Sequence, residues 1–144
     1  MPKKHLLAVL TPLLGLFLAG CGGDRPATIA VSGTVTVNDG PVPGAGTLFF
    51  TPVEPAEGYE RRPGRADFDE QGRYAATTFE EGDGLIPGRY LVGVHCWETP
   101  PNMDGKPVKS HLPKKYNSAE DSGLEITVDS SEGSVTRHFD LKTP

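Results

Sequence analysis

The chain has 144 residues and a formal net charge of −5 at neutral pH, with 19 acidic against 14 basic residues. An acidic chain repels phosphate groups, which argues against a nucleic-acid-binding protein, so no nucleic acid is expected among its partners. It has only two cysteines, Cys21 and Cys96, which limits it to one internal disulfide.

The first 20 residues have the three parts of a secretory signal. Lys3 and Lys4 precede an apolar run over residues 6–18, and the small residues Ala19 and Gly20 follow it. As a helix this run would span roughly 20 Å, which is too short for a hydrocarbon core of about 30 Å. We therefore expect residues 1–20 to be a cleaved signal peptide rather than a permanent transmembrane helix.

The segment Leu18-Ala19-Gly20-Cys21 resembles the lipobox of bacterial lipoproteins. The resemblance implies cleavage between Gly20 and Cys21, with a diacylglyceryl group on the Cys21 thiol. It implies a membrane reached through that lipid, and a location in the cell envelope that faces the periplasm or the exterior. Gly22, rather than aspartate, follows Cys21, which in Gram-negative members is compatible with the outer membrane.

Residues 21–28 are small, polar and proline-bearing, which predicts a lipidated tether before a body over residues 29–144. Loss of Lys3 and Lys4 leaves 12 basic and 19 acidic residues in the mature chain, a net charge of −7. Because the lipid uses Cys21, Cys96 has no disulfide partner. It is either a buried small apolar residue or a reactive thiol.

The body consists of short alternating apolar runs separated by glycine and proline. Seven strands are predicted, over residues 31–37, 47–52, 65–68, 72–77, 89–97, 124–128 and 135–141. In the fifth, alternation places His95 and Trp97 on the face opposite to that of Tyr90, Val92, Val94 and Cys96. This pattern predicts an all-β fold, a single seven-stranded antiparallel β-sandwich of transthyretin-like or Ig-like type.

Several stretches of the body resemble carboxypeptidase regulatory-like domains. They are, in order, residues 31–37 with 40–45 and 47–52, Asp67–Tyr74, Gly82–Tyr90, and Leu112–Tyr116 ahead of Ser122–Leu124. Their combination resembles small lipoproteins of planctomycete-like bacteria and covers nearly all of residues 29–144. The resemblance implies a transthyretin-like sandwich without known catalytic residues.

Metal and cofactor chemistry has little support in the sequence. The three histidines of the body lie in separate segments without the spacing of a metal site (His95, His111 and His138). Asp67, Asp69 and Glu70 could offer oxygens to calcium, but the rest of a calcium loop is missing, which favours an Asx-type turn. We expect no metal and no cofactor.

Catalysis is not expected either. His95 and Cys96 are neighbours in one predicted strand, so their side chains point to opposite faces and cannot form a nucleophile–base pair. Transthyretin-like hydrolases end in Tyr-Arg-Gly-Ser, whereas this chain ends in Lys142-Thr143-Pro144. A small transthyretin-like hydrolase nevertheless stays as the alternative function.

The candidate binding loop consists of Trp97, Glu98, Asn102 and Met103, at the start of the long irregular segment over residues 98–116. An aromatic side chain beside a polar loop can stack on a sugar or anchor a protein partner, although Trp97 could instead cap the core. The sequence therefore predicts a non-catalytic binding or structural module whose partner is an unknown envelope protein or glycan.

Overall fold

The computed structural model describes residues 24–144. The predicted signal peptide, the predicted cleavage site between Gly20 and Cys21, and the cysteine predicted to carry the lipid lie outside these residues. The described part is built from strands, with one short 3-10 turn, η1 (Lys114–Asn117). The predicted all-β class is confirmed. In this part of the chain, no helix has the length and apolar character needed to cross a membrane.

Ten strands are found in residues 24–144. They are β1 (Ala30–Val37), β2 (Gly46–Pro55), β3 (Gly64–Phe68), β4 (Arg73–Ala75), β5 (Gly88–His95), β6 (Trp97–Thr99), β7 (Lys109–Ser110), β8 (Glu125–Val128), β9 (Ser134–Thr136) and β10 (Phe139–Leu141). The predicted strand over residues 89–97 ends at His95, and Trp97 begins a separate strand.

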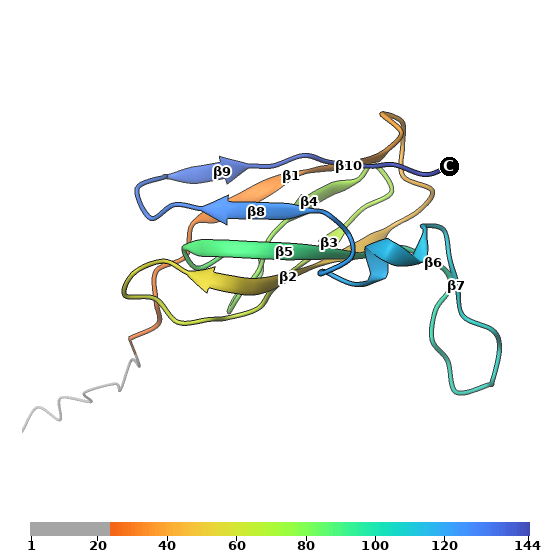
Figure 1. The fold of residues 1–144 in the computed structure, drawn as a ribbon, viewed down its shortest axis with the longest axis horizontal. Coiled ribbons are helices and arrows are strands. Elements are labelled where there is room, and N and C mark those ends of the chain that lie inside the picture. Colours follow the sequence, from red (N-terminus) through yellow and green to blue (C-terminus); the bar gives the residue numbers. More distant parts are fainter. Residues whose placement is uncertain (1–23) are drawn as a thin grey trace, which may run out of the picture.

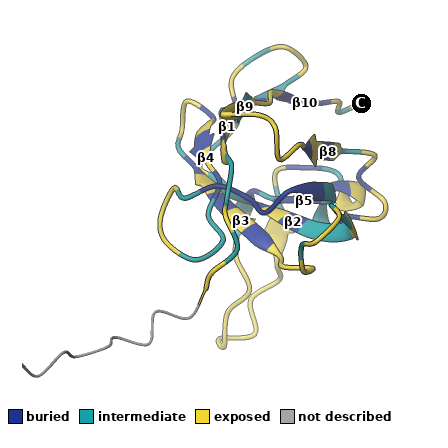
Figure 2. Cartoon of the chain, turned by 90° about the vertical axis from the view of Figure 1, so that its left-hand side faces the viewer, coloured by how far each residue is buried: buried dark blue, intermediate teal, exposed yellow. Residues whose placement is uncertain are grey.

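One eight-stranded sheet curls into a near-barrel, as Figures 1 and 2 show. Its strand order is β10-β1-β4-β3-β2-β5-β8, and β9 also pairs with β1. Five pairs of this sheet are antiparallel, as predicted: β1–β4, β4–β3, β3–β2, β2–β5 and β5–β8. Strands β9 and β10 differ, because both run parallel to β1. The small β6–β7 hairpin lies outside this sheet.

The last predicted strand, over residues 135–141, is broken into β9 and β10 at Arg137. The Arg137 N–H donates to the Ser32 carbonyl at 2.8 Å, and the Arg137 carbonyl accepts a 2.6 Å hydrogen bond from the Tyr74 hydroxyl. The alternation of side chains continues through the break, so the sequence pattern predicts one strand where the structure has two.

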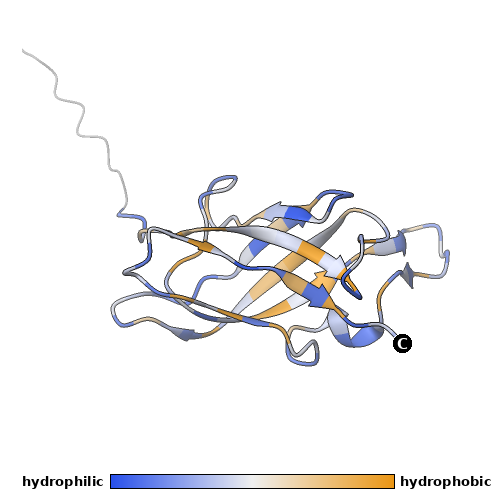
Figure 3. Ribbon diagram, turned by 90° about the horizontal axis from the view of Figure 1, so that it is seen from above, coloured by the Kyte–Doolittle hydropathy of each residue, from blue (hydrophilic) through white to orange (hydrophobic). Residues whose placement is uncertain are grey.

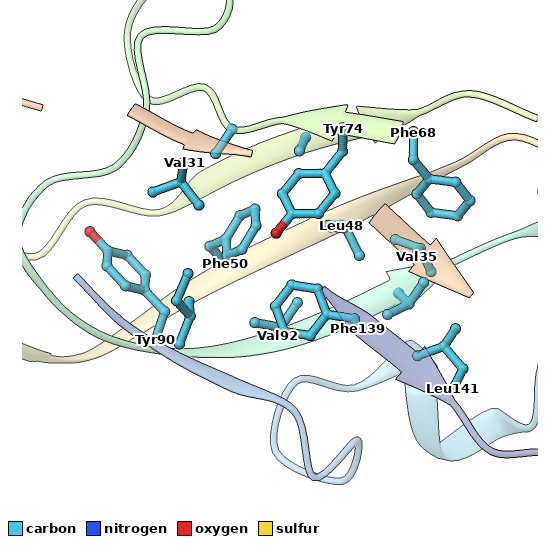
Figure 4. Close-up of a cluster of buried hydrophobic side chains, with 14 of the residues drawn as sticks. Val31, Val35, Leu48, Phe50, Phe68, Tyr74, Tyr90, Val92, Phe139 and Leu141 are labelled. Atoms are coloured by element: carbon cyan, nitrogen blue, oxygen red, sulfur yellow. The ribbon is translucent and has the colours of Figure 1, made fainter. Parts of the chain in front are cut away.

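The core fills the space inside the near-barrel. Leu48 and Phe50 of β2 are buried, and so are Tyr90, Val92 and Val94 of β5 and Cys96 directly after it, which form the predicted inner face. Figure 4 shows the side chains of several strands meeting around Phe50, whose ring centroid lies 6.4 Å from that of Tyr74 and 6.5 Å from that of Tyr90. Hydrophobic residues accordingly concentrate on the strands and hydrophilic ones in the loops (Figure 3).

The turn over residues 69–72 joins β3 to β4. The Asp69 carboxylate accepts hydrogen bonds from the backbone N–H groups of Gln71 and Arg73, which makes the predicted Asx-type turn. Gly72 has a φ of +77°, and a Cβ at this position would lie 2.1 Å from the Val35 carbonyl oxygen, so only glycine fits. Tyr74 then points into the core, as predicted.

Tyr116 connects the two ends of the sheet near η1. This tyrosine is buried, and its hydroxyl donates to the Lys142 carbonyl at 3.0 Å while it accepts from the Lys142 N–H at 2.7 Å. Since η1 packs on β5 and Lys142 directly follows β10, the two hydrogen bonds hold the sheet closed at this end.

A charged cluster beside this closure joins the β1–β2 turn to the C-terminal residues. The Asp140 carboxylate accepts hydrogen bonds from the Lys142 ammonium group, the Asp39 N–H and the Thr36 hydroxyl, and these lower its pKa to about 2. Lys142 also lies 3.0 Å from the Asp39 carboxylate.

We expect Asp140 to make the stability of the fold depend on pH in the acidic range. Its folded pKa of about 2 is below the ordinary value of 3.8, so the carboxylate stabilises the fold fully above pH 4. That contribution is lost as the pH falls from 4 through 2. Denaturant midpoints measured across this range should fall less steeply for Asp140→Asn than for the wild type. Equal slopes would contradict this role.

The chain enters the near-barrel at one end and the β6–β7 hairpin projects from the other (Figure 1). The loop after β2 and the connection from β8 to β9 lie at the entry end, and the C terminus lies at the hairpin end. This polarity decides which loops lie far from the end at which the described chain begins.

Candidate functional site

Three side chains form an aromatic row on the outer face of the sheet, near the hairpin end: Phe49, His95 and Trp97. The ring centroids of Phe49 and His95 are 4.6 Å apart, and those of His95 and Trp97 are 5.0 Å apart. Phe49 is 37% exposed, and the other two side chains are half-buried. The row therefore presents aromatic surface outside the core.

Strand alternation puts the row in this position. Leu48 and Phe50 point into the core, so Phe49 between them points outward. Phe49 and His95 then meet because β2 and β5 are hydrogen-bonded neighbours with Thr47 opposite His95. Trp97 follows two residues later and continues along the same face. Trp97 packs on the His95 ring at the outer face and is not among the residues of the buried core, which favours a surface role over a cap on the core.

Polar groups lie beside the His95 ring. Its Nε2 atom is 3.3 Å from the carbonyl oxygen of Asn117, the last residue of η1. The side-chain oxygen of the same Asn117 is buried without a hydrogen-bond partner. That oxygen is enclosed by protein atoms, so the hydrogen-bonding group of the row itself is the imidazole of His95.

The rest of the candidate binding loop lies on the projecting hairpin. Strands β6 and β7 pair Trp97 with Ser110 and Thr99 with Lys109, so the irregular segment over residues 98–116 is partly ordered by a ladder. The hairpin thus carries the loop beyond the sheet, away from the row.

The three remaining loop residues differ in their surroundings. Asn102 is used by the loop itself, since its side-chain oxygen accepts from the N–H groups of Asp104 and Lys106. Glu98 lies 3.9 Å from the Lys109 ammonium group. Met103 is fully exposed. Trp97 alone of the four predicted residues belongs to the aromatic row.

The sequence predicted that His95 and Trp97 share a face, but not that Phe49 of the neighbouring strand lies beside them. The signal for Phe49 was present, because the same alternation that buries Leu48 and Phe50 exposes the residue between them. The signal for the contact was not present, since it depends on the pairing of β2 with β5.

Cys96 and His95 point to opposite faces, as predicted. The Cys96 side chain is buried, with its sulfur 3.5 Å from the Gly44 carbonyl oxygen, and burial raises the pKa of its thiol. A raised pKa disfavours the thiolate, so Cys96 behaves as a buried small residue rather than a reactive one.

The predicted acidic group is engaged in local contacts. Asp67 accepts hydrogen bonds from Arg65 and Thr47, which lower its pKa, and the Arg73 N–H bond is the main cause of the lowered pKa of Asp69. In residues 24–144 no group of three or more His, Cys, Asp or Glu side chains is placed to hold a metal ion.

The three histidines remain apart. His95 lies in the aromatic row, His138 has its Nδ1 atom 2.8 Å from the Thr34 hydroxyl oxygen, and His111 follows β7.

No protein-family model, curated protein or solved structure matches the chain. The function proposed below therefore rests on the geometry of the aromatic row.

Proposed function

We propose that this chain is a lipid-anchored, non-catalytic binding module of the cell envelope, and that the aromatic row binds a glycan of that envelope. The observation that carries the proposal is the contact of Phe49, His95 and Trp97 on the outer face of the sheet. Aromatic rings that lie outside a core, beside polar groups, are typical of surfaces that bind ligands.

The chemistry of the row fits a sugar. The C–H groups of a pyranose ring pack on aromatic faces, and its hydroxyl groups need neighbouring acceptors and donors. The imidazole of His95, in the middle of the row, carries ring nitrogens of this kind. Aromatic faces and a ring that can form hydrogen bonds are thus both present in the row.

The position of the row fits an anchored protein. A lipid on Cys21 would hold the end of the near-barrel at which the chain enters, and the row lies toward the opposite end, where the hairpin projects (Figure 1). The row would then face away from the membrane. Two acyl chains suffice for stable anchoring where a single chain does not.

We expect Trp97→Ala to weaken glycan binding about tenfold, which corresponds to ~1.4 kcal/mol. Loss of the indole ring removes the largest aromatic surface of the row, and Phe49→Ala should act in the same direction. Binding is measured by co-sedimentation with purified peptidoglycan and with envelope polysaccharide. Met103→Ala is the matched control, since this residue is exposed on the hairpin but lies outside the row.

Three outcomes would contradict the glycan proposal. Equal binding by all variants would show that the row is not the contact surface. An equal loss in Met103→Ala would assign binding to the hairpin. Binding that disappears after protease treatment of the envelope fraction would assign a protein partner.

The anchor has its own test in the two cysteines. We expect the wild type and Cys96→Ala to be recovered with membranes, and Cys21→Ala to be recovered in the soluble fraction. Mass spectrometry of the mature N terminus should find Cys21 as the first residue, carrying the added lipid mass. An unmodified Cys21, or cleavage at another bond, would contradict the lipobox prediction.

A further inference from the structure

The near-barrel has an open seam between β8 and β9. Strand β8 is the last strand of the sheet order, and β9 pairs only with β1, so these two strands face each other without a ladder. They bound a groove of about 340 Å³, lined by Glu125, Ile126, Thr127, Val135, Thr136 and Arg137. Figures 1 and 2 show β8 and β9 as neighbours at this side of the barrel.

The walls of the seam carry unpaired backbone groups. The Leu124 carbonyl accepts from the Val92 N–H of β5, and alternate residues of a strand direct their backbone polar groups to the same side. Ile126 and Val128 therefore face β5, and Glu125 and Thr127 direct their N–H and C=O groups into the seam.

Strand β9 on the opposite wall alternates in the same way. The Arg137 N–H donates to Ser32 of β1, so Val135 faces β1 as well. Ser134 and Thr136 then direct their N–H and C=O groups toward β8. Each wall thus offers donors and acceptors repeated every second residue, about 6.8 Å apart, which is the repeat of an extended peptide.

The seam also holds an uncompensated positive charge. Arg137 lines the groove with its guanidinium group 5.6 Å from the centre of the Phe139 ring, and it makes no salt bridge within residues 24–144. On the facing wall, Glu125 is already paired with Arg89 at 3.2 Å. A ligand in the seam is therefore best matched by a carboxylate beside Arg137.

We propose that the seam accepts an extended segment of a partner protein, which adds as a strand between β8 and β9 and places an acidic residue beside Arg137. Backbone groups repeated at strand spacing on both walls match a peptide backbone. Because β8 and β9 run in opposite directions, the added strand would be antiparallel to one and parallel to the other.

The two walls also restrict the form of the partner. A strand at the edge of a folded sheet is attached to its own neighbour on one side, so it can pair with one wall only. A strand between β8 and β9 pairs on both sides, and the occupant must be an isolated extended segment, such as a terminus or a linker. Toward the hairpin end, the hydrogen bonds between Tyr116 and Lys142 join the two sides, so the open part of the seam is the part bounded by β8 and β9.

The test uses the full chain and a synthetic peptide with the sequence of residues 124–129, which alternates apolar and polar residues and carries two carboxylates. Amide hydrogen exchange is followed by NMR without and with excess peptide. We expect the amides of Glu125, Thr127, Ser134 and Thr136 to exchange rapidly in the free chain and about tenfold more slowly with peptide. A peptide with proline in place of its threonine is the matched control and should protect less.

Two variants locate the site. Thr127→Pro removes an N–H that β5 does not use and should abolish protection, whereas Thr127→Ala keeps the N–H and should preserve it. Arg137→Ala should weaken peptide binding while the backbone pairing remains. Slow exchange of the four amides in the free chain, or unchanged rates with peptide, would overturn the proposal. The amide exchange rates of the wild type, without and with peptide, test the proposal even if the proline variant does not fold.

Discussion

Phe50→Ala should destabilise the fold by about 3–5 kcal/mol, the usual cost of removing a buried phenylalanine side chain. Phe50 is 1% exposed, and its ring lies between those of Tyr74 and Tyr90, so surrounding atoms cannot collapse into the space without moving several strands. Single domains are stabilised by about 5–15 kcal/mol in total, so this change consumes a large part of the free energy of unfolding. Urea unfolding followed by circular dichroism measures it.

The neighbouring Phe49 provides the control. It has the same side chain on the same strand, but it points outward and is 37% exposed. We expect Phe49→Ala to cost about 1 kcal/mol or less, mainly through its contact with His95. Equal losses of stability in the two variants would contradict the assignment of inner and outer faces on β2. The pair also separates stability from binding, since only Phe49 belongs to the aromatic row.

Gly33→Ala is the second change with a large expected effect, at about 3 kcal/mol or more. A Cβ at this position would lie 1.8 Å from the carbonyl oxygen of Arg137, at the break between β9 and β10. That oxygen accepts the hydrogen bond of the buried Tyr74 hydroxyl, so moving it away would also weaken this contact. Overpacking alone costs about 1–3 kcal/mol, and a buried group left without its partner adds a similar amount.

Gly44→Ala is the matched control, because no atom lies within 4 Å of a Cβ built at that position. The same chemical change should there alter the free energy of unfolding by about 0.5 kcal/mol or less. Thermal unfolding of the two variants measures the difference. If Gly33→Ala were as stable as Gly44→Ala, the close approach of β1 to Arg137 would be contradicted.

The sequence predicted the fold class, and for β5 it predicted which side chains face the core. Alternation is a local property, since each residue's face depends only on its position in its own strand. The turn chemistry was also local, as the Asp69 turn and the positive φ of Gly72 illustrate. For these features the outcome is determined by residues a few positions apart in the chain.

The binding residues were predicted only in part. Trp97 belongs to the aromatic row, with His95 on the face that alternation predicts for both. Asn102 instead organises the hairpin loop from within, and Phe49 was not predicted to lie beside these two rings. A loop rich in proline and polar residues gives no indication of which side chains its own hydrogen bonds will use. Phe49 and His95 are neighbours because β2 pairs with β5 in a particular register, and register is a relation between distant segments.

By itself, then, the sequence determined the all-β class, the alternation of the strands and the turn residues, while the signal peptide over residues 1–20 and the lipid on Cys21 stay predictions. Only the tertiary structure decided that the last predicted strand divides at Arg137 and runs parallel to β1, that the sheet stays open between β8 and β9, and that three aromatic rings meet on its outer face. The reason is physical: the face of a residue follows from local backbone geometry, whereas strand partners are selected by how the whole core packs.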